Sequence, residues 1–295
     1  MLLSIGGEEE ITAIVNLHGF DAPQFVFMAT RRGVAKKVPV AEFANAKTRG
    51  IVAIRLDEGD GLVAARLTSG RDEMVLVTRK GWALRFHEQS VRAMGRATRG
   101  VQGVRLSDKD ELAGVAMVNA GEQMLVVSEF GFGKRIAYDN FTAHGRGTRG
   151  QIAYKAGEKT GEVVAALSVS SKDDLVCITS QGNTLKLRLA DIAVLGKTAM
   201  GVRIVNITRP DMVVGVARVV KDEEAEIREA AAAAAAQAEG SGAEEPDGSD
   251  GAEDDEAGLD GAQGAEAEEN DAYDENDAED DSPGDEDEDA SDSDD

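Results

Sequence analysis

Short apolar runs rich in β-branched residues recur through the first 220 residues at a nearly constant spacing. One series comprises "ITAIV" (11–15), "LVAARL" (62–67), "LAGVAMV" (112–118), "VVAALSV" (163–169) and "VVGVARVV" (213–220). In a second series each apolar run ends at a glycine, namely Gly33, Gly81, Gly131 and Gly182. Because the interleaved series share one period of about 50 residues, we interpret them as an internal repeat.

Each repeat has the pattern of β structure. The apolar runs are short, and polar clusters such as "NAGEQ" and "SSKDD" separate them. In "TLKLRL" the alternation places Leu185 and Leu187 on one face of a strand and Lys186 and Arg188 on the other. Each unit offers about four strands, and four-stranded units of about 40–50 residues are typical of radial, bladed folds. The sequence therefore predicts an all-β, propeller-like domain of about four blades over residues 1–220.

A third series, of glycine-flanked basic turns, has the same period. The stretch "GRATRGVQGVRL" (95–106) is one copy, and related stretches occupy 45–56, 144–155 and 195–206. Arginine presents a planar fork that matches phosphate oxygens, and glycine lets the backbone approach a phosphate closely. For a single such turn, solubility is the favoured interpretation, whereas a periodic set would place phosphate contacts at regular intervals. We therefore favour contact with nucleic acid, and the lack of interleaved aromatic residues favours duplex over single-stranded DNA.

The charge of the chain is divided between two regions. The whole chain has a formal net charge of −24, but residues 221–295 alone hold 33 acidic and 2 basic residues. The first 220 residues are consequently basic, with a net charge of +7. Residues 221–240 predict a short alanine-rich helix or linker, and the composition of 241–295 predicts a disordered acidic tail. This tail is either a tethered DNA mimic that competes for the basic surface or a solubilising segment.

The sequence offers little support for an enzyme active site. His18, His87 and His144 lack the spacing of metal ligands, and the lone Cys177 has no partner for a disulfide. A phosphate-binding loop of the G-x-x-x-x-G-K-[ST] type is also missing. No apolar run reaches the ~20 residues that a membrane-spanning helix needs. We expect an intracellular chain with no catalytic residue, metal or cofactor of its own.

The order of several motifs resembles one family, the C-terminal domain of DNA gyrase A. These motifs are "ITAIV", "VFMAT", "GVAKKV", "LTSGRDEMVL", "QSVRAMGRATRGVQGVRL" and "GFGKRIAYDNF", followed by a last strand and an acidic tail. The resemblance covers nearly all of residues 1–220. It implies a β-pinwheel, in which neighbouring blades exchange strands, and a basic rim that wraps duplex DNA during negative supercoiling. The rim residues that it implies here are Lys36, Lys37, Lys47, Arg49, Arg85, Arg96, Arg99, Arg105, Lys134, Arg135, Arg146, Arg149, Lys186, Arg188, Lys197 and Arg203.

The chain departs from the pattern of this family in two respects. The family's heptapeptide Q-R-R-G-G-K-G has only degenerate relatives here, such as "RATRGVQG". The family usually has six blades, whereas this sequence holds four repeats and a closing strand. We therefore expect the last two-thirds of such a domain, with an unpaired sheet edge near Ile11–Val15. Two alternatives stay open: the corresponding C-terminal domain of topoisomerase IV, and a propeller-like scaffold for protein interactions.

The resemblance also implies partners and a location. The partners would be duplex DNA and the gyrase catalytic core, which consists of the rest of gyrase A together with gyrase B. ATP and magnesium would be used by those other domains and not by this chain. The chain would act in the bacterial cytoplasm, at the nucleoid, and not at a membrane.

Overall fold

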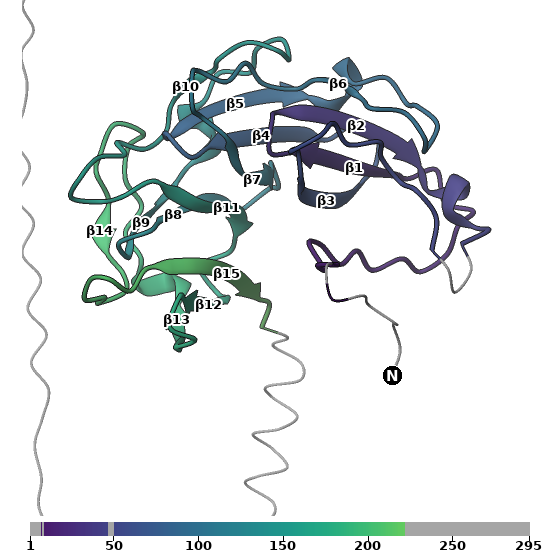
Figure 1. The fold of residues 1–295 in the computed structure, drawn as a ribbon. Helices are drawn as coiled ribbons and strands as arrows, with labels where there is room; N and C mark the ends of the chain where they lie inside the picture. The colour runs from purple at the N-terminus through teal and green to yellow at the C-terminus, as the bar shows by residue number, and fades with distance from the viewer. Residues whose placement is uncertain (1–6, 8, 47–49, 222–295) are drawn as a thin grey trace, which may run out of the picture. The chain divides into compact units, whose positions relative to one another are not determined.

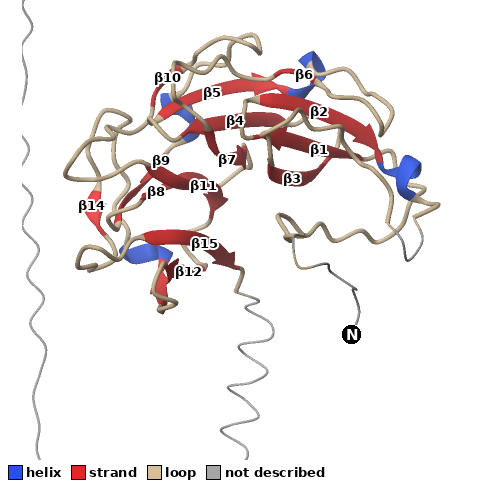
Figure 2. Ribbon diagram, in the orientation of Figure 1, coloured by secondary structure: helices blue, strands red, loops and turns tan. Residues whose placement is uncertain are grey.

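Strands account for nearly all the regular structure of the chain. The structure, a computed structural model, describes residues 7, 9–46 and 50–221. These described residues form fifteen strands and four short 3-10 helices, drawn in red and blue in Figure 2. The predicted all-β fold is therefore confirmed.

The described strands group into four sheets, which we call blades 1 to 4 (Figure 1). Blade 1 has the order β3 (Leu62–Thr68), β1 (Phe25–Thr30), β2 (Val34–Pro39), β6 (Val101–Gln102). Blade 2 has the order β7 (Leu112–Met117), β4 (Glu73–Thr78), β5 (Trp82–His87), β10 (Gln151–Ile152). Blade 3 has the order β11 (Val163–Val169), β8 (Gln123–Ser128), β9 (Phe132–Ile136), β14 (Val202–Arg203). Blade 4 has three described strands, β15 (Val213–Val219), β12 (Asp174–Thr179) and β13 (Thr184–Arg188).

Each blade is assembled from separate parts of the sequence. An antiparallel hairpin supplies two neighbouring strands, and a long inner strand comes from the start of the next repeat. In blades 1 to 3 the fourth strand is a two-residue outer strand, which follows the hairpin of the next blade in the sequence. The hairpins lead into the 3-10 helices η1 (Val40–Phe43), η2 (Glu88–Ser90), η3 (Tyr138–Asn140) and η4 (Leu189–Asp191). This exchange of strands between neighbouring blades is the pinwheel arrangement that the family resemblance implies.

The periodic glycines of the second series lie at the turns of the four described hairpins. Gly33, Gly81, Gly131 and Gly182 have φ values of 77°, 83°, 74° and 85°. Glycine adopts this left-handed conformation without the steric cost that a Cβ atom imposes. The turns therefore explain why one glycine is required in each repeat.

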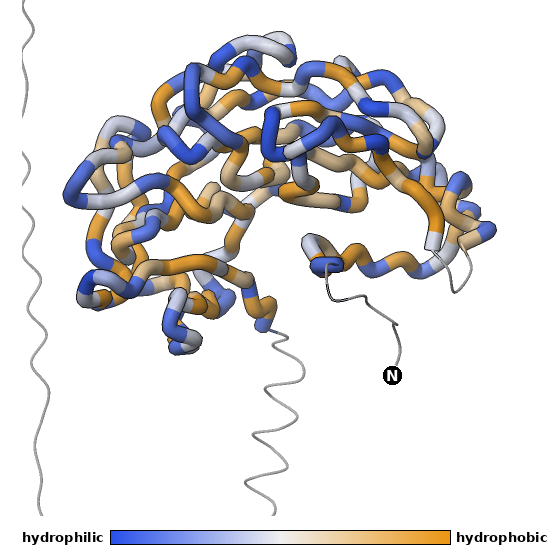
Figure 3. The backbone as a smooth tube through the Cα atoms, viewed as in Figure 1, coloured by the Kyte–Doolittle hydropathy of each residue, from blue (hydrophilic) through white to orange (hydrophobic). Residues whose placement is uncertain are grey.

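The core lies in layers between successive blades. In β1, Phe27 and Ala29 pack with β4 of blade 2, whereas Val26 and Met28 pack on the opposite face. The first hairpin strands of blades 2 and 3, β4 and β8, are likewise covered on both faces, which explains why each is a nearly continuous apolar run. These runs appear as the orange segments of the tube in Figure 3. At the inner side, β3 contacts β7, β7 contacts β11, and β11 contacts β15.

Four of the five predicted inner strands are confirmed, and the first is wrong. Residues 11–15 are irregular in the structure, with Ala13 and Val15 packed against blade 1 and the Ile14 side chain exposed. The described chain has no hairpin before blade 1, so a strand at 11–15 has nothing to pair with. The unpaired sheet edge lies instead in blade 4, at β13. The predicted helix or linker at 221–240, except Lys221, and the predicted tail at 241–295 lie outside the described residues.

Candidate nucleic-acid interface

The basic turns of the third series lie directly before the outer strands. Residues 95–100 precede β6, residues 145–150 precede β10, and residues 196–201 precede β14. In the first two turns the threonine hydroxyl donates to the carbonyl of the leading glycine, at 2.9 Å from Thr98 to Gly95 and 3.1 Å from Thr148 to Gly145. These local bonds fix the shape of the turn.

The glycine at the end of each turn allows contact with the protein itself. Gly100, Gly150 and Gly201 have φ values of 110°, 81° and 90°. A Cβ atom added to Gly150 would lie 2.2 Å from the carbonyl oxygen of Ala83 in β5. The turn therefore packs directly on the hairpin strand beneath it. We predicted that the glycine would allow close approach to a phosphate, but here it allows close approach to the backbone of the protein itself.

Consecutive turns are hydrogen-bonded to one another. The Arg55 amide donates to Thr98 O at 3.0 Å, and the Arg105 amide donates to Thr148 O at 2.9 Å. Between the next two copies, Lys197 Nζ donates to Gln151 Oε1 at 2.6 Å. Residues 50–56, 95–106, 144–155 and 195–206 thus form one connected surface, which we call the rim band.

Two predicted rim lysines support this band from beneath. Lys36 and Lys134 are buried, with 0% of each residue exposed. The Lys134 ammonium donates to the carbonyls of Gly196, Lys197 and Ala199 at 2.8, 2.9 and 2.7 Å. Lys36 binds the equivalent turn in the same way, donating to Thr98 O at 2.9 Å and also to Arg96 O. Burial lowers the pKa of both lysines, and that of Lys134 falls to about 8.

Three more predicted rim residues also have internal partners. Lys37 is buried and lies 3.6 Å from Glu88 Oε2, and buried Arg135 donates from Nε to Ile192 O at 2.8 Å. The half-buried Arg85 donates from Nε to Glu73 at 2.7 Å and from Nη1 to two backbone carbonyls. Lys36 and Lys134 thus hold outer segments in place, whereas Lys37, Arg85 and Arg135 bind groups in or beside the 3-10 helices η2, η3 and η4. Lys36, Lys37, Arg85, Lys134 and Arg135 therefore have internal partners and are not among the exposed residues of the rim band.

Four predicted arginines are exposed along the rim band: Arg99, Arg105, Arg149 and Arg203. Arg99 forms an ion pair with Asp57 at 2.8 Å. The Arg149 guanidinium lies 3.8 Å from the ring centroid of Trp82, and that of Arg203 lies 5.1 Å from Phe132. A stacked guanidinium is held in a fixed position while its N–H edges stay free to bind phosphate oxygens.

The remaining predicted residues have mixed environments. Arg146 donates to Ser90 O at 2.8 Å, and half-buried Arg96 lies 4.0 Å from Glu42. Outside the rim band, Lys186 and Arg188 of blade 4 are exposed and pair with acidic neighbours at 2.8 and 3.0 Å. Half-buried Lys197 also donates to Asn140 O at 3.0 Å. Lys47 and Arg49 lie outside the described residues.

The structure adds two basic residues to the rim band that sequence reasoning missed. Arg55 and Lys155 are exposed, and they occupy the same position in their repeats as Arg105. Each follows the glycine of its turn by five residues, as Arg105 does, so this shared spacing could have identified both residues from the sequence.

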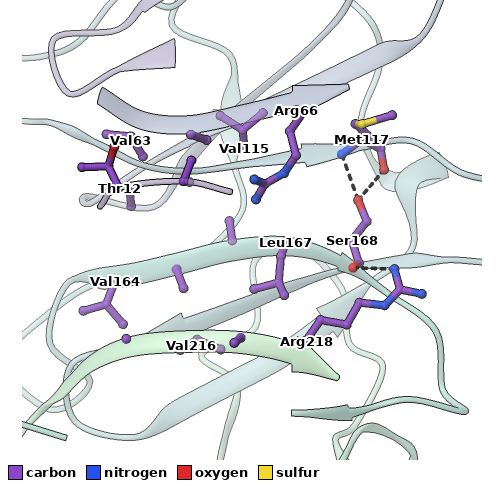
Figure 4. A pocket seen from close by; sticks show the side chains of 18 of the residues that line it. Thr12, Val63, Arg66, Val115, Met117, Val164, Leu167, Ser168, Val216 and Arg218 are labelled. Atoms are coloured by element: carbon purple, nitrogen blue, oxygen red, sulfur yellow. Dashed lines mark hydrogen bonds between the residues drawn. The ribbon is translucent and has the colours of Figure 1, made fainter. Parts of the chain in front are cut away.

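A cavity of about 620 Å³ lies on the other side of the blades, between the inner strands (Figure 4). Arg66 and Arg218 reach toward it from β3 and β15. Arg218 is engaged with Glu122 and Asp173, both at 2.6 Å. The exposed basic groups of the rim band belong to the outer segments and do not line this cavity.

The described residues contain no group of three or more His, Cys, Asp and Glu side chains that could hold a metal ion. In the same part of the chain, no helix combines the length and the apolar character needed to cross a membrane.

Comparison with known proteins identifies the repeat. The model of the DNA gyrase C-terminal domain, a β-propeller, matches residues 24–69, 72–119, 122–170 and 173–219. Each matched range contains one hairpin and the inner strand of its blade. The DNA gyrase A protein of Treponema pallidum (strain Nichols) is 58% identical over 220 residues, which are 75% of this chain and 27% of that protein. The chain thus spans about a quarter of the length of the curated relatives it matches.

Solved structures share the arrangement of blades. A structure of the DNA gyrase A C-terminal domain has a TM-score of 0.67 at 27% identity, covering 74% of this chain and 73% of that one. The crystal structure of the C-terminal domain of DNA topoisomerase IV has a TM-score of 0.71 at 22% identity, covering 79% of this chain and 73% of that one. At this low identity, the similarity is evidence for a shared fold and not for a shared function. From the four matched ranges and the identity to the gyrase A protein, we conclude that the chain belongs to the DNA gyrase C-terminal domain family.

Proposed function

We propose that this chain binds duplex DNA along the rim band and bends or wraps it without catalysing a reaction. The observation that carries the proposal is the continuity of the band, because hydrogen bonds between consecutive turns hold its arginines in a fixed series. A series of guanidinium groups on one connected surface can follow the phosphates of one duplex.

Arg149 and Arg203 have the environment that a phosphate contact needs. Both are exposed, and their guanidinium groups lie over Trp82 and Phe132. The aromatic ring limits the rotamers of the side chain, so less conformational entropy is lost when a phosphate binds. Contacts of this kind carry no sequence code, so binding should depend on duplex backbone and salt more than on base sequence.

The role of the chain within a topoisomerase is the second part of the proposal. By relation to the DNA gyrase A protein, the chain would contribute DNA wrapping to negative supercoiling by a complete gyrase in the bacterial cytoplasm. Its protein partners would be the rest of gyrase A and the whole of gyrase B. ATP and magnesium would act in those domains.

A charge-matched pair of variants tests the DNA interface. The rim variant carries Arg105→Gln, Arg149→Gln and Arg203→Gln, and the control carries Arg31→Gln, Arg32→Gln and Arg71→Gln, which are exposed outside the band. Affinity for a duplex is measured by fluorescence anisotropy over a salt series. If three phosphate contacts are lost, the log–log salt slope of the rim variant becomes shallower by roughly 2.7, whereas the control keeps the wild-type slope.

Equal effects of the two variants would contradict a localised interface. Absence of duplex binding by the wild-type chain would instead favour a protein-interaction scaffold.

A further inference from the structure

His144 occupies a position that two other turns fill with an apolar residue. It directly precedes the first glycine of its turn, as Met94 and Leu195 do in theirs. All three backbone amides donate to the second hairpin strand beneath them, and the His144 amide donates to Arg85 O at 2.8 Å. Met94 and Leu195 are half-buried, whereas His144 is exposed. The backbone position is thus shared, but in blade 2 it carries an exposed imidazole that packing does not require.

The imidazole of His144 contacts Gln151, the first residue of β10. Nε2 of the ring lies 3.3 Å from Nε2 of the Gln151 amide. Two other partners fix the orientation of this amide: its Oε1 accepts from the Lys197 ammonium at 2.6 Å, and its Nε2 donates to Thr142 O at 3.2 Å. Because an ammonium group can only donate and a carbonyl can only accept, the amide nitrogen is the atom that faces His144.

The orientation of the amide determines the protonation state of the ring. The amide nitrogen of Gln151 offers N–H groups, so the ring nitrogen that meets it must accept. A neutral imidazole has one donor and one acceptor nitrogen, whereas an imidazolium has two donors. The contact therefore exists only while His144 is neutral, with its proton on Nδ1. Protonation at Nε2 would set two donors against each other and end the contact.

His144 accordingly has two states that differ in charge and in partner. Histidine is the side chain whose charge ordinarily changes between pH 5 and 8. In the neutral state the ring is held against Gln151, whose other end binds Lys197. In the charged state the ring is released from Gln151 and adds one positive charge to the rim band.

The elements around His144 present more cations than anions. The charged groups on these elements are Lys197 in the turn before β14, Arg146 and Arg149 in the turn of His144 itself, Arg85 of β5 with its partner Glu73, and Asp139 of η3. One amide group separates His144 from the Lys197 ammonium. A phosphate that binds at this part of the rim band therefore also approaches the imidazole.

We propose that His144 is a proton-linked phosphate contact, which takes up a proton at Nε2 and leaves Gln151 when the rim band binds duplex DNA. A negative charge within about 4–6 Å favours the protonated ring. The imidazolium can then donate a charge-assisted hydrogen bond to a phosphate oxygen. The DNA contact rests on the proposed function, whereas the neutral tautomer and its bond with Gln151 do not.

Proton uptake and DNA binding at this site must strengthen each other. If bound DNA favours the protonated ring, a protonated ring favours DNA by the same factor, because the two binding free energies are linked. Affinity for a duplex consequently rises as the pH falls. A single proton limits the change to about tenfold in affinity for each pH unit.

The tautomer of His144 is tested without DNA. We expect ¹⁵N NMR of the histidine rings in the full 295-residue chain at pH 7.5, where an ordinary histidine is mostly neutral, to show the proton of His144 on Nδ1. Gln151→Leu should abolish this preference. A proton on Nε2 in the wild-type chain would overturn the contact on which the inference depends.

The proton linkage is tested by fluorescence anisotropy of a duplex at constant salt between pH 5.5 and 7.5. This range lies below the pKa of Lys134, which is about 8. We expect the affinity of the wild-type chain to fall with rising pH, by up to about tenfold per unit, and its salt slope to be steeper by roughly 0.9 at the low end. His144→Gln should lose both effects, and His144→Arg should bind with little dependence on pH. His18→Gln, at an exposed histidine outside the rim band, should keep the wild-type behaviour.

The outcomes separate this inference from the proposed function. An equal dependence on pH in the wild-type chain and in His144→Gln would overturn the role of His144 and leave the rim band as the DNA interface. Absence of duplex binding at every pH would overturn the proposed function and, with it, the phosphate contact of His144.

Discussion

The Arg149 guanidinium lies 3.8 Å from the ring centroid of Trp82, and the two residues come from different repeats. Trp82 begins the second hairpin strand of blade 2, and Arg149 belongs to the turn that delivers the outer strand of the same blade. The contact exists because strands are exchanged between neighbours. It places an exposed cation on a rigid support at the rim.

This pair supplies an intrinsic probe, because Trp82 is the only tryptophan in the chain. If Arg149 binds a phosphate, the electric field at the indole changes, and duplex DNA should alter the tryptophan emission. Arg149→Ala should reduce this change, weaken binding, and make the salt slope shallower by roughly 0.9. Arg71→Ala, at an exposed site away from the rim band, is the control. Unchanged Trp82 emission at saturating DNA would contradict this placement of the duplex.

Lys134 should contribute to stability more than to DNA binding. Lys134→Met removes three hydrogen bonds from a charged donor and leaves the carbonyls of 196–199 without that partner. We expect a loss of about 1.5–3 kcal/mol in the free energy of unfolding, measured by urea titration. Lys155→Met, at an exposed position of the rim band, should change this free energy little. A larger loss of unfolding free energy for Lys155→Met than for Lys134→Met would show that the buried lysine does not hold the turn.

Cys177 should be unreactive in the folded chain. Burial raises the pKa of its thiol to about 11 from an ordinary 9.0, so at pH 8 the thiolate fraction is lower by roughly 100-fold. A thiol reagent such as DTNB should therefore label the chain only when urea unfolds it, and the labelling midpoint should coincide with the unfolding transition. Rapid labelling of the native chain at pH 8 would mean that blade 4 opens readily.

The acidic tail should weaken DNA binding if it competes for the rim band. Deletion of residues 241–295 would then increase affinity for a duplex, most strongly at low salt, where the competition is electrostatic. The measurement compares anisotropy titrations of the full and truncated chains at two salt concentrations. Equal affinities would leave the tail with a solubilising role alone.

The repeat, the strand types and the hairpin turns could be predicted from the sequence, whereas the pairing of the outer strands could not. Each outer strand has two residues and carries no local pattern, and its partner lies far away in the sequence. This explains why several predicted rim residues have internal partners in the structure. The alternation of polar and apolar residues predicts a basic, outward face for the second strand of a hairpin, as in Lys186 and Arg188 of blade 4. In blades 1 and 3 the outer segment covers the opposite face, where Lys36 and Lys134 become internal donors. Lys37 and Arg135, which correspond to Lys186, donate to backbone carbonyls of the following repeat.

The predicted strand at 11–15 failed for a related reason. The apolar pattern of "ITAIV" is that of an inner strand, but an inner strand forms only against a hairpin. Inner strands β3, β7, β11 and β15 each have one, and residues 11–15 have none in the described chain. Their apolar side chains pack on blade 1 without entering a sheet.

The most direct test of the account is ligation of a nicked circular duplex in the presence of this chain. If the rim band guides DNA along a curved path of fixed hand, the ligated circles should show a linking-number shift of one sign that grows with the amount of bound chain. The rim variant with Arg105→Gln, Arg149→Gln and Arg203→Gln should show a smaller shift than the charge-matched control at equal occupancy. Full binding of the wild-type chain with no change in linking number would contradict the account.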